Sequence, residues 1–156
     1  MSEEIKKGLL GIVVDETTIS HVVPELSALT YRGYKVQDLC DKCDFEEVAY
    51  LVLHGELPSK VQLKKFIKEE RSNRKLSKTI IKNIQQMPKN AHPMDVIRTC
   101  VSLMGLEDKD TKDNSPKANM RKALKIFSQT PTAVAAYFRA RKGKKIIAPD
   151  KKLSFS

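Results

Sequence analysis

Two cysteines, Cys40 and Cys43, stand three residues apart, a spacing found in redox motifs and in half of a zinc site. Zinc needs about four ligands, and no second pair of Cys or His residues lies nearby in the sequence. A thioredoxin-like function needs a strand-to-helix turn within a βαβ unit, and the surrounding pattern lacks one. We interpret both cysteines as incidental and predict that the chain holds no metal.

Three histidines are the next candidates for chemistry, and they are scattered at positions His21, His54 and His92. None has an acid or a nucleophile beside it at the spacing of a catalytic motif. His54 precedes Gly55 at an expected helix C-terminus, where a positive imidazole is favoured. His92 precedes Pro93 at an expected helix N-terminus, where it can act as a cap. We predict three structural histidines.

The candidates for anion binding are Arg32, which stands beside Gly33, and Arg98, which follows Asp95 by three residues. Either guanidinium can hold a substrate carboxylate, or it can form a buried ion pair or bind main-chain carbonyls. We favour the structural alternative for both arginines. The sequence therefore assigns no catalytic and no cofactor-binding residue, and it leaves the substrate-binding residues unknown.

Positive charge is in excess, because 29 Lys and Arg residues against 19 Asp and Glu give a formal net charge of +10. The densest basic cluster consists of Arg139, Arg141, Lys142, Lys144 and Lys145. It can meet the phosphates of a nucleic acid or of a cofactor, but no aromatic residues are interleaved with it for base stacking. Basic residues elsewhere are mixed with acidic ones. We interpret the excess as a solvated helical surface and predict no nucleic-acid partner.

The elements that position these residues begin with short β-type runs at Leu9–Val14 and Thr17–Val23, which Pro24 ends. Residues 30–34 predict a turn, in which Gly33 is the residue best suited to a positive φ. We therefore predict a small β ribbon over about residues 9–31.

Helical patterns follow over about residues 35–140. Asp44 and Glu47 form a capping box before an apolar run, Val48–Leu53, that must be buried on most faces. Further signals for helix starts are Ser59 with Gln62, Pro93, and Ser115-Pro116. The signals for helix ends are Gly55, Pro58, Pro88 and Gly105. Pro131 should break or kink the last helix. Residues 141–156 form a basic tail without a closing helix, and the fold class is mainly α.

The length of 156 residues suffices for one domain with a sizeable core. No apolar run approaches the roughly 18 residues that a membrane span requires, and the N-terminus lacks a signal-peptide pattern. Three cysteines argue against a secreted disulfide framework. We therefore predict a cytoplasmic protein that does not interact with a membrane.

Four ordered blocks resemble the citrate synthase family: Gly8–Ser20, Leu29–Tyr34, Phe45–Pro58 and His92–Thr99. Short-chain bacterial and archaeal members, including 2-methylcitrate synthases, are the most similar, and residues 115–119 and 147–156 also fit them. The resemblance implies the N-terminal part of a large helical domain. It also implies a parent acyl-CoA C-acyltransferase of the citrate (Si)-synthase type that acts as a homodimer.

Such enzymes condense acetyl-CoA, or propionyl-CoA, with oxaloacetate in the tricarboxylic acid or methylcitrate cycle. The resemblance implies acyl-CoA as a substrate and no tightly bound cofactor. The family's catalytic Asp and two His belong to the second half of its chain, and nothing in residues 1–156 matches them. We therefore expect an N-terminal fragment that is inactive alone.

A second interpretation is non-enzymatic. The chain would then be a stand-alone basic helical module that binds or regulates a partner through its positive surface.

Overall fold

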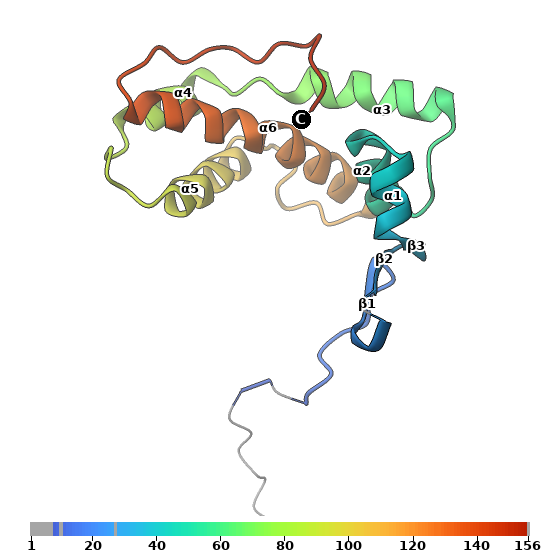
Figure 1. Ribbon diagram of the computed structural model, residues 1–156. Coiled ribbons are helices and arrows are strands. Elements are labelled where there is room, and N and C mark those ends of the chain that lie inside the picture. Colours follow the sequence, from blue (N-terminus) through green and yellow to red (C-terminus); the bar gives the residue numbers. More distant parts are fainter. Residues whose placement is uncertain (1–7, 10, 27, 156) are drawn as a thin grey trace, which may run out of the picture. The chain divides into compact units, whose positions relative to one another are not determined.

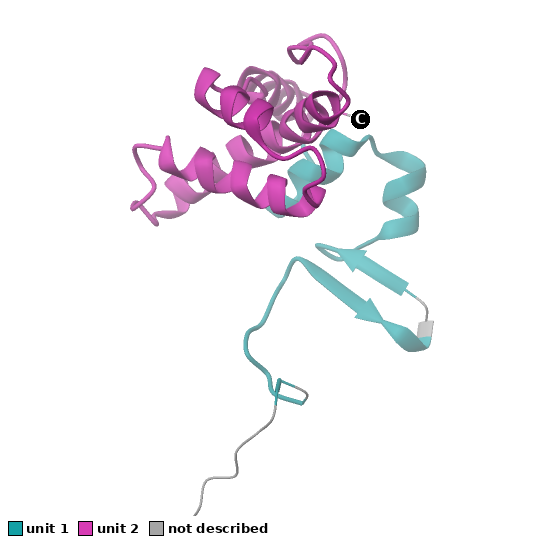
Figure 2. Cartoon of the chain, turned by 90° about the vertical axis from the view of Figure 1, so that its left-hand side faces the viewer, with its two compact units in different colours: residues 1–58 teal, residues 59–156 magenta. Residues whose placement is uncertain are grey.

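The computed structural model describes residues 8–9, 11–26 and 28–155 (Figure 1). The chain divides into two compact units, residues 1–58 and residues 59–156 (Figure 2). Within the described residues the fold is mainly helical, with one small antiparallel ribbon near the N-terminus. This confirms the predicted fold class. Among the described residues, no helix is both long and apolar enough to cross a membrane.

The ribbon of unit 1 has three short strands: β1 (Ser20–Val23), β2 (Ala28–Tyr31) and β3 (Tyr34–Lys35). They pair in the order β1-β2-β3, and a 3₁₀ turn (Pro24–Leu26) precedes β2. Arg32 and Gly33 connect β2 to β3 with φ values of 50° and 88°. Two positive φ angles in succession define the type I′ turn, whose twist suits a two-residue hairpin. The predicted turn at Gly33 is confirmed.

The first predicted strand, Leu9–Val14, is wrong for the residues that the structure describes, since Leu9 and residues 11–14 form no strand. Leu10 lies outside the described residues. A strand needs a ladder partner or a packed face, and Val13 and Val14 are 84% and 71% exposed. The second run, Thr17–Val23, is a strand only at its end, where β1 pairs with β2.

Two helices complete unit 1, α1 (Val36–Lys42) and α2 (Phe45–His54). The Glu47 carboxylate accepts a hydrogen bond from the Asp44 N–H at 2.8 Å, as the predicted capping box requires. At the other end Gly55 has a φ of 95° and donates its N–H to the Leu51 carbonyl at 2.8 Å. Local capping signals therefore fix both ends of α2.

Unit 2 consists of α3 (Lys60–Asn73), α4 (Lys78–Gln86), α5 (Pro93–Leu106) and α6 (Pro116–Arg141). Each helix begins with a side chain that accepts a hydrogen bond from a main-chain N–H of the first turn: Ser59, Ser77, His92 and Ser115. Such caps satisfy donors that the helix itself leaves unpaired.

The long helix α6 is the element on which α3, α4 and α5 all pack (Figure 1). The core between them is aliphatic and includes Ile80, Ile84 and Cys100, all with 1% exposure or less. Tyr137 is the large aromatic residue of this core, and it is 3% exposed. Unit 2 therefore consists of three helices that all pack on α6.

The predicted end of α5 at Gly105 is wrong, and of the two outcomes predicted for Pro131, a break or a kink, the break is wrong. Gly105 does not end α5, which runs to Leu106. Pro131 does not break α6, which is continuous from Pro116 to Arg141. Proline removes a single main-chain donor, whereas α6 gains burial on both sides of it, at Ser128 and at Ala133. Tertiary packing thus outweighs the local penalty.

Candidate functional site

Each of the three histidines is in an exposed position. His92 is a helix cap, because its Nδ1 accepts the Met94 N–H at 3.2 Å. His54 ends α2 and stacks on Tyr50, with 4.1 Å between the ring centroids. His21 lies in β1 opposite Thr30. His21 and His54 belong to unit 1, and His92 belongs to unit 2.

The cysteines are free thiols. Cys40 is exposed on α1, Cys43 is half-buried just after it, and Cys100 is buried in the core of unit 2. Burial raises the pKa of the Cys43 thiol, and the neighbouring carboxylates of Glu47 and Asp44 raise it further. A raised pKa keeps a thiol protonated and poorly nucleophilic. Within the described residues no three His, Cys, Asp or Glu side chains gather into a metal-binding group.

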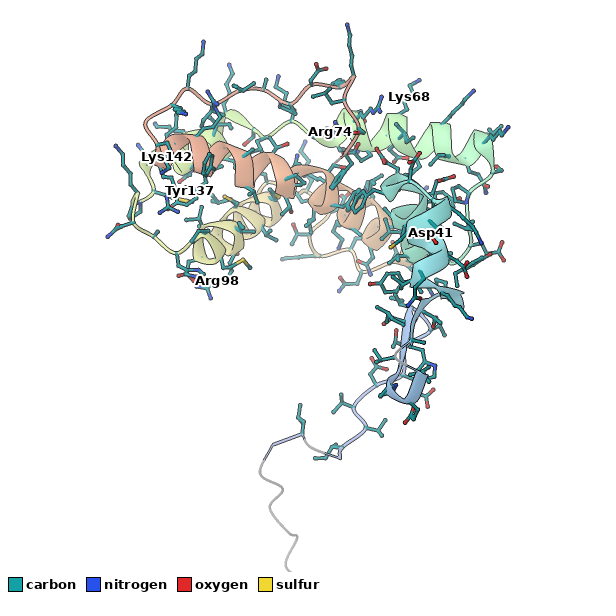
Figure 3. All side chains as sticks on the ribbon, in the orientation of Figure 1. Asp41, Lys68, Arg74, Arg98, Tyr137 and Lys142 are labelled. Atoms are coloured by element: carbon teal, nitrogen blue, oxygen red, sulfur yellow. The ribbon has the colours of Figure 1, made fainter. Side chains whose placement is uncertain are left out.

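The Arg32 guanidinium donates hydrogen bonds to other residues of unit 1. Its Nη2 and Nε donate to the Val52 carbonyl at 3.0 and 3.3 Å, and its Nη1 donates to the Thr18 hydroxyl at 2.7 Å. Arg98 forms an exposed pair with Asp95 at 3.0 Å and points away from α5 (Figure 3). Arg32 thus binds a main-chain carbonyl, as the structural alternative predicts, whereas the ion pair of Arg98 is exposed and not buried.

The predicted basic cluster divides into two kinds of residue. Arg139 donates to the Lys145 carbonyl and Arg141 lies 5.8 Å from the centre of the Tyr137 ring, so both arginines fix the end of α6. Lys142, Lys144 and Lys145 are exposed. Another basic group was missed: Lys75, Lys78, Lys82 and Lys145 surround a cavity of about 430 Å³ whose walls include Ile81 and Ile146.

A second polar group that the sequence analysis missed is the buried pair Glu70 and Arg74, at the end of α3 (Figure 3). The Arg74 Nη2 lies 2.7 Å from Glu70 Oε2, and the Arg74 Nε donates to the same carboxylate at 2.8 Å. The side chains are 0% and 9% exposed for Glu70 and Arg74. The signal in the sequence is an i,i+4 spacing of opposite charges, which also occurs on many exposed helices.

Arg74 holds the segment that follows α6. Residues 142–155, here called the C-terminal strap, turn back at Gly143 and run alongside α4 towards the end of α3 (Figure 1). The Arg74 Nη1 donates to the carbonyls of Asp150 and Leu153, both at 3.1 Å. Farther along, the ring of Phe155 stacks on Phe127 with 4.4 Å between the centroids. The predicted basic tail is thus an anchored segment in its described part.

The strap, α3 and α6 enclose a cavity of about 380 Å³ whose lining includes Glu70, Arg74, Pro131 and Phe155. Its charged groups are engaged with each other and with the strap. Glu70 accepts two or more hydrogen bonds from Arg74. This arrangement is suited to holding a segment of chain.

The loop between α5 and α6 is held by a separate charge cluster. Asp108 accepts hydrogen bonds from the Asp110 N–H at 3.0 Å and from Lys125 Nζ at 3.3 Å. Arg121 lies 3.6 Å away. The main-chain hydrogen bond and then these cations hold the pKa of Asp108 below its ordinary value. The cluster joins the loop to α6.

Comparison with known proteins gives a consistent result. The family described as citrate synthase, C-terminal domain, matches residues 8–156. The 2-methylcitrate synthase of Mycobacterium tuberculosis is 46% identical over 98% of this chain, and the citrate synthase of Mycolicibacterium smegmatis is 47% identical over 97%. The chain spans only 38% and 40% of these two relatives.

The fold agrees with the sequence comparison. The crystal structure of citrate synthase from Pyrobaculum aerophilum superposes with a TM-score of 0.87 and 29% identity. The superposition covers 93% of this chain and 38% of that one. Sequence and fold therefore lead to one family.

Proposed function

The chain belongs to the citrate synthase family, and from this membership we propose that it forms the N-terminal part of the large helical domain of such a synthase. The whole enzyme would condense acetyl-CoA or propionyl-CoA with oxaloacetate, and it would work as an acyl-CoA C-acyltransferase. The observation that carries the proposal is 46–47% identity to proteins named as 2-methylcitrate synthase and citrate synthase, over nearly all of this chain.

Residues 1–156 would contribute structure to that enzyme, and the proton transfers would be carried out by residues outside them. The engagement of Arg32, Arg74 and Arg98 with protein groups supports this division. The local contacts of His92, which caps α5, and of His54, which stacks on Tyr50, support it too. Alone, the chain would be inactive.

A homodimer is part of the same proposal. Apolar side chains on the outer face of α6 support it, since Val134 and Phe138 are 44% and 58% exposed. Exposed apolar groups at one helical face favour association with another surface. A cytoplasmic location is also proposed, supported by free cysteines, one of them exposed on α1.

The inactivity is tested with the purified 156-residue chain. CoA release from acetyl-CoA or propionyl-CoA is followed in the presence of oxaloacetate, and we expect the rate of a reaction without protein. The matched control is the M. smegmatis relative under the same conditions. Turnover above background by the chain alone would show that its own residues carry the chemistry.

Family membership is tested by a chimera in which residues 8–156 replace the matched segment of the M. smegmatis citrate synthase. We expect a folded enzyme that retains condensation activity, because nearly half of the replaced residues are identical. A folded but inactive chimera would contradict the structural role. The ratio of acetyl-CoA to propionyl-CoA turnover shows whether this segment affects substrate choice.

The non-enzymatic alternative keeps one supporting observation, the four lysines around an apolar-walled cavity. Under this alternative the chain would bind an anionic partner, either nucleic acid or an acidic protein surface. Fluorescence anisotropy with a single-stranded oligonucleotide and with an acidic peptide tests it. Binding that weakens steeply with added salt would support the alternative, and no binding at low salt would exclude it.

A further inference from the structure

The C-terminal strap is attached to unit 2 in a way that differs from the attachment of its helices. The strap contains neither helix nor strand over its described residues, so it lacks the repeating hydrogen bonds of those elements. Lys151, Lys152 and Leu153 are exposed, and Leu153 has 63% of its surface open to solvent. Its position therefore depends on individual contacts, two of which involve residues 150–155.

The first of these contacts is the Arg74 guanidinium. One edge of the group is fixed by Glu70, through Nε and Nη2. The remaining nitrogen, Nη1, donates to the carbonyls of Asp150 and Leu153. Because guanidinium is planar and its donors are fixed in direction, Glu70 sets the orientation in which Arg74 meets the strap. Because the acceptors are main-chain carbonyls, these two hydrogen bonds do not depend on which side chains stand at positions 150 and 153.

The second contact is the stacking of Phe155 on Phe127, and Phe127 in turn lies 6.4 Å from Phe66 on α3. Between the two contacts the strap covers the cavity of about 380 Å³. A segment without regular secondary structure that lies over incompletely filled space belongs to the part of a protein that opens most readily.

We propose that Arg74 is the positioning residue of the strap: it holds residues 150–155 on α3 and α6, and its loss releases the strap while the helices stay folded. Opening would separate Phe155 from Phe127 and expose the cavity. The proposal concerns the described residues of unit 2 alone, and it does not depend on the enzymatic activity proposed above.

The test removes both charges together, in the variant Glu70→Leu/Arg74→Met. Replacing only Arg74 would leave Glu70 buried and unpaired, whereas apolar replacement of a whole buried pair is often tolerated. The matched control is Asp95→Leu/Arg98→Met, which removes an exposed pair from α5 by the same substitutions. Both variants lose one arginine, so the number of trypsin sites is the same.

Two measurements are made on the 156-residue chain: the rate of tryptic cleavage after Lys151 and Lys152, and amide hydrogen exchange. Hydrogen bonds to a charged group are the stronger ones, so their loss should raise cleavage and exchange in residues 150–155 by about ten-fold or more. Exchange in α4 and α5 should stay as in the unsubstituted chain, and the control should change neither region.

Two results would overturn the proposal. One is an unchanged rate of cleavage and exchange in the strap of the Glu70→Leu/Arg74→Met variant. The other is an equal loss of protection in α4 and α5, because the buried pair would then stabilise unit 2 as a whole. The variant Arg74→Lys adds a graded measurement. It keeps the charge but not the planar fork, so the strap should show an intermediate rate.

Discussion

The Tyr137 hydroxyl lies 2.9 Å from the carbonyl oxygen of Pro88 and 3.1 Å from that of Ala91. One buried side chain of α6 thereby reaches both ends of the turn between α4 and α5. The single hydroxyl hydrogen is shared between these two carbonyls, of which that of Pro88 also accepts the Ala91 N–H at 3.2 Å. Packing of the ring and hydrogen bonding of its tip act at the same junction (Figure 3).

Removing that hydroxyl should weaken unit 2. For Tyr137→Phe we expect a loss of about 1 kcal/mol in the free energy of unfolding, because the partly buried carbonyls of Pro88 and Ala91 lose this donor. Urea denaturation followed by circular dichroism measures the change. Tyr34→Phe is the matched control, since Tyr34 is 42% exposed, and it should change stability little. Equal stability of Tyr137→Phe and the unsubstituted chain would contradict the role of the hydroxyl.

Truncating a core side chain should lower the free energy of unfolding more than truncating a similar side chain at the surface. Ile84 has 0% exposure in α4, so Ile84→Ala should lower the free energy of unfolding by about 2–5 kcal/mol. Val61→Ala is its control, because Val61 is 78% exposed on α3. Thermal unfolding of the two variants should differ clearly. Similar melting temperatures of the two variants would show that Ile84 is not buried in the core in solution.

Two glycine substitutions should have opposite effects on stability. Gly33→Ala places a side chain at a φ of 88°, so it should destabilise the β2–β3 turn by about 1 kcal/mol. Gly105→Ala lies in α5 with nothing within 4 Å of the added Cβ, so it should stabilise by about 0.5–1 kcal/mol. Denaturant midpoints compare the two. Stabilisation by Gly33→Ala would be inconsistent with the type I′ turn.

Asp108 should make stability depend on acid pH. Its folded pKa is below the ordinary value of 3.8, so its contribution is present above the unfolded pKa and is lost as pH falls through the folded pKa. Asp108→Asn should therefore be less stable than the unsubstituted chain at neutral pH. The difference should shrink between about pH 5 and pH 2. Urea midpoints measured across that range provide the test, and a pH-independent difference would count against the charge cluster.

The starts of α2 and α3 were predictable because their causes are local. Asp44 with Glu47 and Ser59 with Gln62 lie three residues apart, and their hydrogen bonds close within one turn. The Gly33 turn was predictable for the same reason. In each case the sequence neighbours that determine the geometry are also the neighbours in space.

Other features depend on distant partners and could not be read from a local pattern. The strand expected at Leu9–Val14 lacks a described partner, and Pro131 stays helical because α6 is packed on both sides of it. Arg74 was overlooked because its strap acceptors are 76 and 79 residues away in sequence. An i,i+4 pair of charges does not reveal whether it is buried.

The position of α6 in the chain has a consequence for synthesis. This helix begins at Pro116, and α3, α4 and α5 all pack on it. A ribosome adds about 5–20 residues per second. The apolar faces of α3, α4 and α5 therefore leave the exit tunnel seconds before α6, the helix on which they pack. Until α6 emerges, the nascent chain displays Ile80 and Ile84 to solvent, and general chaperones that bind apolar segments have their longest access to it at that stage.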